Sequence, residues 1–289
     1  MKNYFGGESM NQSALTHCEL IGEHPKQTIF AEWLSYEDLG SSNNKIHRKL
    51  LEVSGMREHA VEQISDWIIK HHVADTTIDR FRRRREGILK KYGLDEYLSQ
   101  QQFLPVAEKT MKGNGAEIVL AEYLQASSNL QVLVYKLRYN PNVNQSMKGD
   151  DVLLLNKENP SHKIIVGESK FRKVPGKAVV DEITDEFGKN VKLPLSILFV
   201  ANRLSELGEE ELADELENLN IDVKQGKVPV VNVGFLLSNH NTASNVEKHL
   251  ISDNPKFLLL SLGVDRPDEL ISQSFAMANE KLKRRLQNE

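Results

Sequence analysis

A glutamate and a lysine stand two positions apart where an apolar run ends, in IIVGESKF over residues 164–171. The run predicts a β-strand. Because side chains alternate between the two faces of a strand, Glu168 and Lys170 should share one face. An ionised group is costly to bury unless it is paired or binds a metal. A carboxylate that ligates Mg²⁺, beside a lysine that orients water or stabilises phosphate charge, is suited to phosphodiester hydrolysis.

A hard cation needs further oxygen ligands, and the preceding apolar run could supply one. GDDVLLL over residues 149–155 places Asp150 and Asp151 before that run, which the turn NKENPS joins to the strand of Glu168. Antiparallel pairing of the two runs would bring Asp151 beside Glu168. Asp150 would then face the other side, where we expect it to be exposed to solvent. The alternative is that Gly-Asp serves here as a turn ending.

Glu117 is a third acidic candidate. It lies at the border of the apolar stripe of a helix expected over residues 116–125, from which it could reach the same site. A glutamate in the first turn of a helix also complements the helix dipole. Both interpretations of Glu117 stay open at this point.

The elements that must position these residues fall into two regions. Residues 1–105 read as mostly helical, with a helix over 76–92 that begins after Thr76 or Thr77 and stops at Gly93. Residues 106–289 alternate strands and helices, which predicts an α/β fold with a mixed central sheet flanked by helices. The strands are expected over 131–139, 151–155, 162–171, 195–201 and 228–237, and 257–263 forms either another strand or a core helix.

Residues 107–202 resemble the PD-(D/E)xK nuclease superfamily, whose core runs helix–strand–strand–strand–helix–strand. The matching motifs are GDD at 149–151 and ESK at 168–170, although the proline of the superfamily's name is absent. The superfamily pattern Gly-x-Asp selects Asp151 over Asp150. The resemblance implies a deoxyribonuclease that uses Mg²⁺, for which Mn²⁺ can substitute. The implied metal-site residues are Asp151, Glu168, the carbonyl of Ser169 and, for a second cation or a bound water, Glu117, with Lys170 activating the attacking water.

More narrowly, the helical first part, the motifs GDDVLLLN and GESKF, and the overall length resemble the nuclease subunits (HamA) of the Hachiman anti-phage defence system. This resemblance implies DNA as the substrate and a helicase protein as the partner. Residues 1–105 would then dock the partner or cap the site, and 106–289 would form the nuclease domain. Two alternatives stay open: a non-catalytic DNA-clamping or adaptor subunit in which Glu168 and Lys170 form a structural ion pair, and a stand-alone restriction-type endonuclease.

Charge is unevenly placed along the chain. The total of 37 basic and 41 acidic side chains excludes a uniformly basic nucleic-acid coat, yet residues 76–92 carry seven basic and two acidic side chains, a local charge of +5. This run could contact DNA phosphates or a partner, or it could be a solvated helix face. Its candidate contact residues are Arg80, Arg82, Arg83, Arg84 and Arg85.

The remaining features indicate a soluble cytoplasmic protein. There is a single cysteine, Cys18, and no stretch approaches the ~20 apolar residues that cross a bilayer. The first residues lack the apolar core of a signal peptide. We therefore expect no membrane association. The sequence leaves the oligomeric state open.

Overall fold

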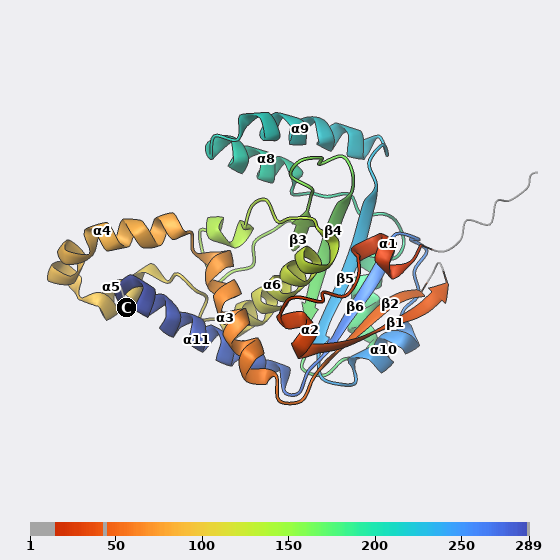
Figure 1. Cartoon of the computed structure of the whole chain (residues 1–289), viewed down its shortest axis with the longest axis horizontal. Coiled ribbons are helices and arrows are strands. Elements are labelled where there is room, and N and C mark those ends of the chain that lie inside the picture. The colour runs from red at the N-terminus through yellow and green to blue at the C-terminus, as the bar shows by residue number, and fades with distance from the viewer. Residues whose placement is uncertain (1–14, 43–44, 288–289) are drawn as a thin grey trace, which may run out of the picture.

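The computed structural model describes residues 15–42 and 45–287 and contains a six-stranded sheet in the order β1-β2-β6-β5-β4-β3 (Figure 1). Strands β2, β6, β5 and β4 run parallel to one another, and the edge strands β1 and β3 pair antiparallel with β2 and β4. The predicted mixed α/β sheet flanked by helices is confirmed. The strands are β1 (Leu34–Ser42), β2 (Lys45–Glu52), β3 (Val152–Leu154), β4 (Ile164–Phe171), β5 (Val230–Ser238) and β6 (Phe257–Gly263).

The central strands are buried on both faces, as their continuous apolar runs require. In β6, Leu258 and Leu260 face one hydrophobic cluster and Leu259 faces the other. The first cluster includes α3 (Arg57–His72), α6 (Glu108–Ser128) and α11 (Pro267–Gln287). The second includes α7 (Lys177–Phe187), α8 (Ile197–Glu206), α9 (Glu210–Lys224) and α10 (Thr242–His249). The sheet is thus sandwiched between two helical layers.

Helices predominate in the described part of the first 105 residues, as expected, but two strands that were not predicted are also present. This part of the chain contains α1 (His17–Ile21), α2 (Ile29–Trp33), α3, α4 (Asp75–Tyr92) and α5 (Leu94–Gln101), but also β1 and β2. Strand β2 pairs with β6, so this region completes the sheet of the rest of the chain. The two strands escaped prediction because KIHRKLLE and LSYEDLGSS are rich in polar residues that strands usually disfavour. The role of this region as docking surface or cap stays a prediction.

Two predicted strands are wrong. Residues 195–201 lie mainly in α8, where Ile197, Val200, Ala201 and Leu204 are buried at helical spacing. A short apolar run does not distinguish a buried strand from a buried helix. Residues 131–139 form a single bridge between Gln131 and Leu155, followed by the 3₁₀ helix η1 (Lys136–Tyr139). The segment between α6 and α7 therefore holds two named strands instead of the three expected from the resemblance.

Helix α4 begins at Asp75, before both threonines that were predicted as its N-cap. Its N-cap position is Ala74, so neither Thr76 nor Thr77 caps it, while Gly93 ends it with a positive φ of 75° as expected. Figure 1 shows α4 and α5 extending to one side of the sheet, with the end of α11 beside them. Arg82 links α4 to α11, because its Nε donates to the carbonyl of Arg285 on α11 at 2.9 Å.

Candidate active site

The antiparallel pairing of β3 and β4 places the two acidic motifs together. Val152 lies opposite Gly167 and Leu153 opposite Val166, so the same register continued by one position sets Asp151 against Glu168. Gly167 permits this close packing, since an added Cβ would lie 3.0 Å from side-chain atoms of both Leu120 and Val152. The juxtaposition expected from the sequence is therefore built by the local register.

Asp151 is held by the serine of the ESK motif. The backbone N–H and the hydroxyl of Ser169 both donate to Oδ2 of Asp151, at 2.9 and 3.0 Å. The other carboxylate oxygen, Oδ1, faces Lys136 Nζ at 3.7 Å. With one oxygen anchored to the strand and the other turned towards a cation, Asp151 has the orientation of a preorganised ligand.

Glu117 lies well inside a helix. Because α6 begins at Glu108, nine residues earlier, Glu117 is not in its first turn, and the dipole explanation is wrong. Its side chain is 10 % exposed, and burial raises the pKa of its carboxyl to about 8, opposed by Lys136 and reinforced by Asp151. A strongly perturbed buried carboxyl in a cluster of charges is typical of functional sites.

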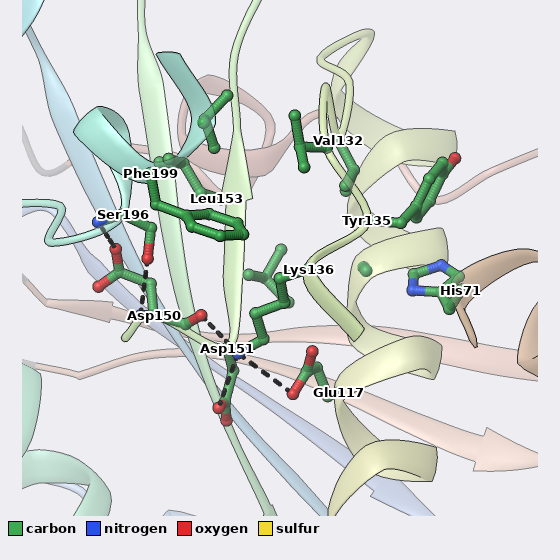
Figure 2. Close-up of a pocket in the computed structure, with 14 residues that line it drawn as sticks. His71, Glu117, Val132, Tyr135, Lys136, Asp150, Asp151, Leu153, Ser196 and Phe199 are labelled. Atoms are coloured by element: carbon green, nitrogen blue, oxygen red, sulfur yellow. Dashed lines mark hydrogen bonds and ion pairs between the residues drawn. The ribbon is translucent and has the colours of Figure 1, made fainter. Parts of the chain in front are cut away.

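Lys136 occupies the space between these carboxylates, and the sequence analysis missed it. Its Nζ lies 3.4 Å from Glu117 Oε2 and donates to the backbone carbonyl of Asp150 at 2.7 Å, as Figure 2 shows. Burial opposes its charge, but Glu117 and Asp151 outweigh burial and raise the pKa of Lys136. The signal was present in the sequence: Lys136 interrupts the apolar run VLVYKLRY, just as Glu168 and Lys170 interrupt theirs.

Glu168 and Lys170 share one face, as predicted, and form an ion pair at 3.0 Å. Lys170 also reaches Glu182 of α7 at 3.2 Å, and Lys192 lies 3.8 Å from the second oxygen of Glu168. Burial and the neighbouring Asp151 raise the pKa of Glu168. Glu182 and Lys192 are further members of the site that sequence reasoning missed, because helix α7 and the segment after it bring them from a distance.

Asp150 is buried, contrary to the expectation that solvent would surround it; its exposed fraction is 2 %. Its Oδ2 accepts from the backbone N–H groups of Leu195 and Ser196 at 2.8 and 2.9 Å, where α8 begins. The free N–H groups at a helix start favour a carboxylate. The error follows from α8, which replaced a predicted strand. The other carboxylate oxygen of Asp150, Oδ1, is buried and forms no hydrogen bond with the described residues.

A small cavity of about 30 Å³ adjoins these groups, large enough for one or two water molecules (Figure 2). Glu117, Lys136 and Asp151 line one side, and apolar side chains such as Val132 and Phe199 line the other. In the described part of the chain, no three His, Cys, Asp or Glu side chains form a metal-binding group. Mg²⁺ typically takes one or two carboxylates plus water and substrate oxygens, so the pair Asp151 and Glu168 fits it in kind.

Comparison with known proteins identifies the family. A family model described as HamA matches residues 28–278. The Hachiman protein HamA of Bacillus cereus is 40 % identical over 264 residues, which covers 91 % of this chain and 96 % of that protein. The chain belongs to the HamA family. The resemblance read from the two motifs is thereby confirmed at the level of this family, whereas membership of the PD-(D/E)xK superfamily stays a prediction.

The region that matches HamA contains every candidate site residue and also the arginine run of α4. None of these arginines lines the cavity beside Glu117 and Asp151; they lie on the helix that extends past the sheet. Across residues 15–42 and 45–287, no helix of this HamA-family chain is long and apolar enough to cross a membrane.

Proposed function

We propose that this HamA-family chain is a Mg²⁺-dependent deoxyribonuclease, the nuclease subunit of a Hachiman anti-phage defence complex. A helicase partner controls it, and it works in the cytoplasm. The observation that carries the proposal is the arrangement of Asp151, Glu168 and Lys170 at the paired ends of β3 and β4. Family membership supports the defence role.

In this proposal, Asp151, Glu168 and the carbonyl of Ser169 hold the cation, and Glu117 serves a second cation or its water. Either Mg²⁺ or Mn²⁺ supplies Lewis-acid activation of the scissile phosphate when bound. Ser169 fixes Asp151 through its N–H and hydroxyl groups. The carboxylates therefore need little reorganisation before they act, which is how preorganised sites gain rate.

Lys170 orients the attacking water and stabilises negative charge that develops on the phosphate. Glu168 and Glu182 hold its ammonium from two sides, at 3.0 and 3.2 Å, and they raise the pKa of Lys170 against the effect of burial. A lysine held charged in this way acts as a fixed cation beside the reacting group.

A specific observation favours one alternative, a non-catalytic DNA-clamping or adaptor subunit. Lys136 already supplies a cation from within the chain, 3.4 Å from Glu117 and 3.7 Å from Asp151, and no three His, Cys, Asp or Glu side chains in the described residues form a metal-binding group. On that interpretation Glu168 and Lys170 form a structural ion pair. An adaptor of this kind would bind DNA with unchanged affinity when Glu168 loses its charge, and it would cleave no DNA.

The deciding experiment measures plasmid degradation by wild type, Glu168→Gln and the matched control Asp185→Asn, with Mg²⁺ or EDTA and with or without the co-purified partner. Asp185 is an exposed carboxylate on α7 that pairs with Lys189. We expect Mg²⁺-dependent degradation by wild type and Asp185→Asn, and a loss of at least about 100-fold in Glu168→Gln. Intact plasmid with all three proteins, bound equally well, would establish the adaptor.

A further inference from the structure

Helices α4 and α5 form an arm that encloses a groove of about 560 Å³. Two arginines, two tyrosines and two glutamines line it, together with Glu96. Arg80 and Arg84 are four residues apart and therefore share one face of α4. A smaller hollow of about 40 Å³ shares Arg80, Arg84 and Tyr97 with the groove and extends it along the arm.

Arg80 and Arg84 give the groove two positive charges, and Glu96 is the acidic side chain that lines it with them. Among the described residues, Arg80 and Arg84 form no ion pair, whereas Arg82 pairs with Asp79 at 3.6 Å and bonds to α11. Cations elsewhere are commonly paired, for example Arg57 with Glu52. Arg82 thus has a structural role in holding the arm, and the guanidinium groups of Arg80 and Arg84 are available to an external anion.

The arm has its own apolar interior, which keeps the groove in shape. Ile78, Phe81 and Ile88 are buried on α4, and the ring of Phe81 packs against Tyr97 of α5 at a centroid distance of 5.1 Å. Tyr92, by contrast, is 45 % exposed. Nζ of Lys91 lies 4.8 Å from the centre of the Tyr92 ring, so a base would stack on the ring surface that Lys91 leaves open, next to the two guanidinium groups.

We propose that this groove binds a single strand of nucleic acid, with Arg80 and Arg84 on successive phosphates and Tyr92 stacked on a base. Stacking needs an unpaired base, which a duplex does not present. The glutamine amides can donate to and accept from base edges. An acidic peptide would satisfy the arginines but would leave the ring and amides unused. The proposal stands apart from cleavage, because none of these residues lies in the active-site cavity.

The test uses the full chain and a fluorescent oligothymidylate of about 20 nucleotides, in EDTA, with anisotropy measured over a salt series. Each phosphate contact with a single strand contributes a slope of about 0.7 to the dependence of log affinity on log salt. Arg80→Gln/Arg84→Gln should therefore lower the slope by about 1.4 and weaken binding at least tenfold. Tyr92→Leu should weaken binding about fivefold or more with an unchanged slope.

The matched control is Lys177→Gln/Lys189→Gln, which removes two exposed charges, one on α7 and one just after its end, and should bind like wild type. The assay is run in EDTA, where metal-dependent cleavage does not proceed, so failure of the proposed cleavage and failure of this proposal are distinguishable. Wild-type affinity and slope in the arginine double variant, with an unchanged melting temperature, would overturn the proposal. Equal losses of affinity for single-stranded and duplex DNA in this variant would also overturn it. So would a variant that no longer co-purifies with a protein partner but binds the oligonucleotide normally.

Discussion

Two clusters of buried charge lie towards opposite edges of the same sheet, and they differ in how well their charges are satisfied. On β2, the Nε and Nη2 groups of Arg48 donate to the two oxygens of Asp38 on β1 at 2.6 and 2.9 Å, and Nη1 donates to the carbonyl of Gly22 at 3.1 Å. At the β3–β4 edge, Lys136 lies 3.4 and 3.7 Å from Glu117 and Asp151.

The difference between the two clusters is visible in the pKa values of the acidic groups. At the β3–β4 edge burial raises the pKa of Glu117 to about 8, and burial together with the neighbouring Asp151 raises the pKa of Glu168. A buried charge with a full set of hydrogen bonds holds the fold, whereas a partly satisfied cluster retains the capacity to bind something else. We use this difference to separate structural from functional charge.

The largest expected effect is on stability at the β1–β2 edge. Arg48→Met should lower the free energy of unfolding by about 2–4 kcal/mol, below the upper range for buried pairs because Asp38 is 33 % exposed and regains water. Urea unfolding measures it. Lys49→Met is the matched control, since Lys49 forms a more exposed pair with Glu37 and should cost under about 1 kcal/mol. Equal losses in the two variants would contradict the comparison.

The second effect is stabilisation by a divalent cation at the β3–β4 edge. At ten times its dissociation constant, Mg²⁺ or Mn²⁺ should stabilise the folded chain by about 1.4 kcal/mol. That corresponds to a rise of roughly 3 °C in melting temperature. Asp151→Asn and Glu168→Gln should abolish the rise, while Asp185→Asn should keep it. A cation shift that survives in Asp151→Asn would remove this aspartate from the ligand set.

The third effect is a pH dependence that arises from Glu117. Its pKa in the folded chain is about 8, above the ordinary value of 4.5, so the folded state keeps a proton that the unfolded state releases. The favourable contribution is complete below pH 4.5 and is lost as the pH rises to 8. Glu117→Gln, measured in EDTA, should therefore melt about 2 °C or more above wild type at pH 8.5 and no higher at pH 4.5. The same difference at both pH values would locate the effect in packing.

Part of this site followed from the sequence, and the reasons are local. The period of two along β4 set Glu168 and Lys170 on one face, and a short turn forced antiparallel pairing with Asp151. The burial of Asp150 could not be read in the same way, since it depends on whether residues 195–201 form a strand or a helix, and a short apolar run is compatible with both.

The fold shows the same division. The apolar strands β4 and β5 were predicted because burial on both faces leaves a continuous apolar run, whereas for β6 the same pattern left a strand and a core helix open. Strands β1 and β2 were not predicted, because the polar residues Arg48 and His47 are buried in β2 through an ion pair with Asp38 and a hydrogen bond with Glu247, which only the folded chain brings together. Lys136 falls between these cases: its charge inside an apolar run was visible, but its carboxylate partners were set by tertiary structure.

The smallest expected effect is a change of under about 1 kcal/mol in the stabilisation that a divalent cation gives the folded chain. It tests whether Lys136 and the cation bind the same carboxylates. Lys136→Met removes the ammonium between Glu117 and Asp151 and leaves a side chain of similar length. Without metal the variant should melt below wild type, because the two carboxylates then lack a cation. The rise produced by Mg²⁺ should exceed that of wild type by about 1 °C or more. Lys227→Met, at an exposed pair with Asp222, should leave the rise unchanged. An equal rise in Lys136→Met and wild type would mean that the ammonium and the cation act at separate places, and that the loose contacts of Lys136 belong to the fold.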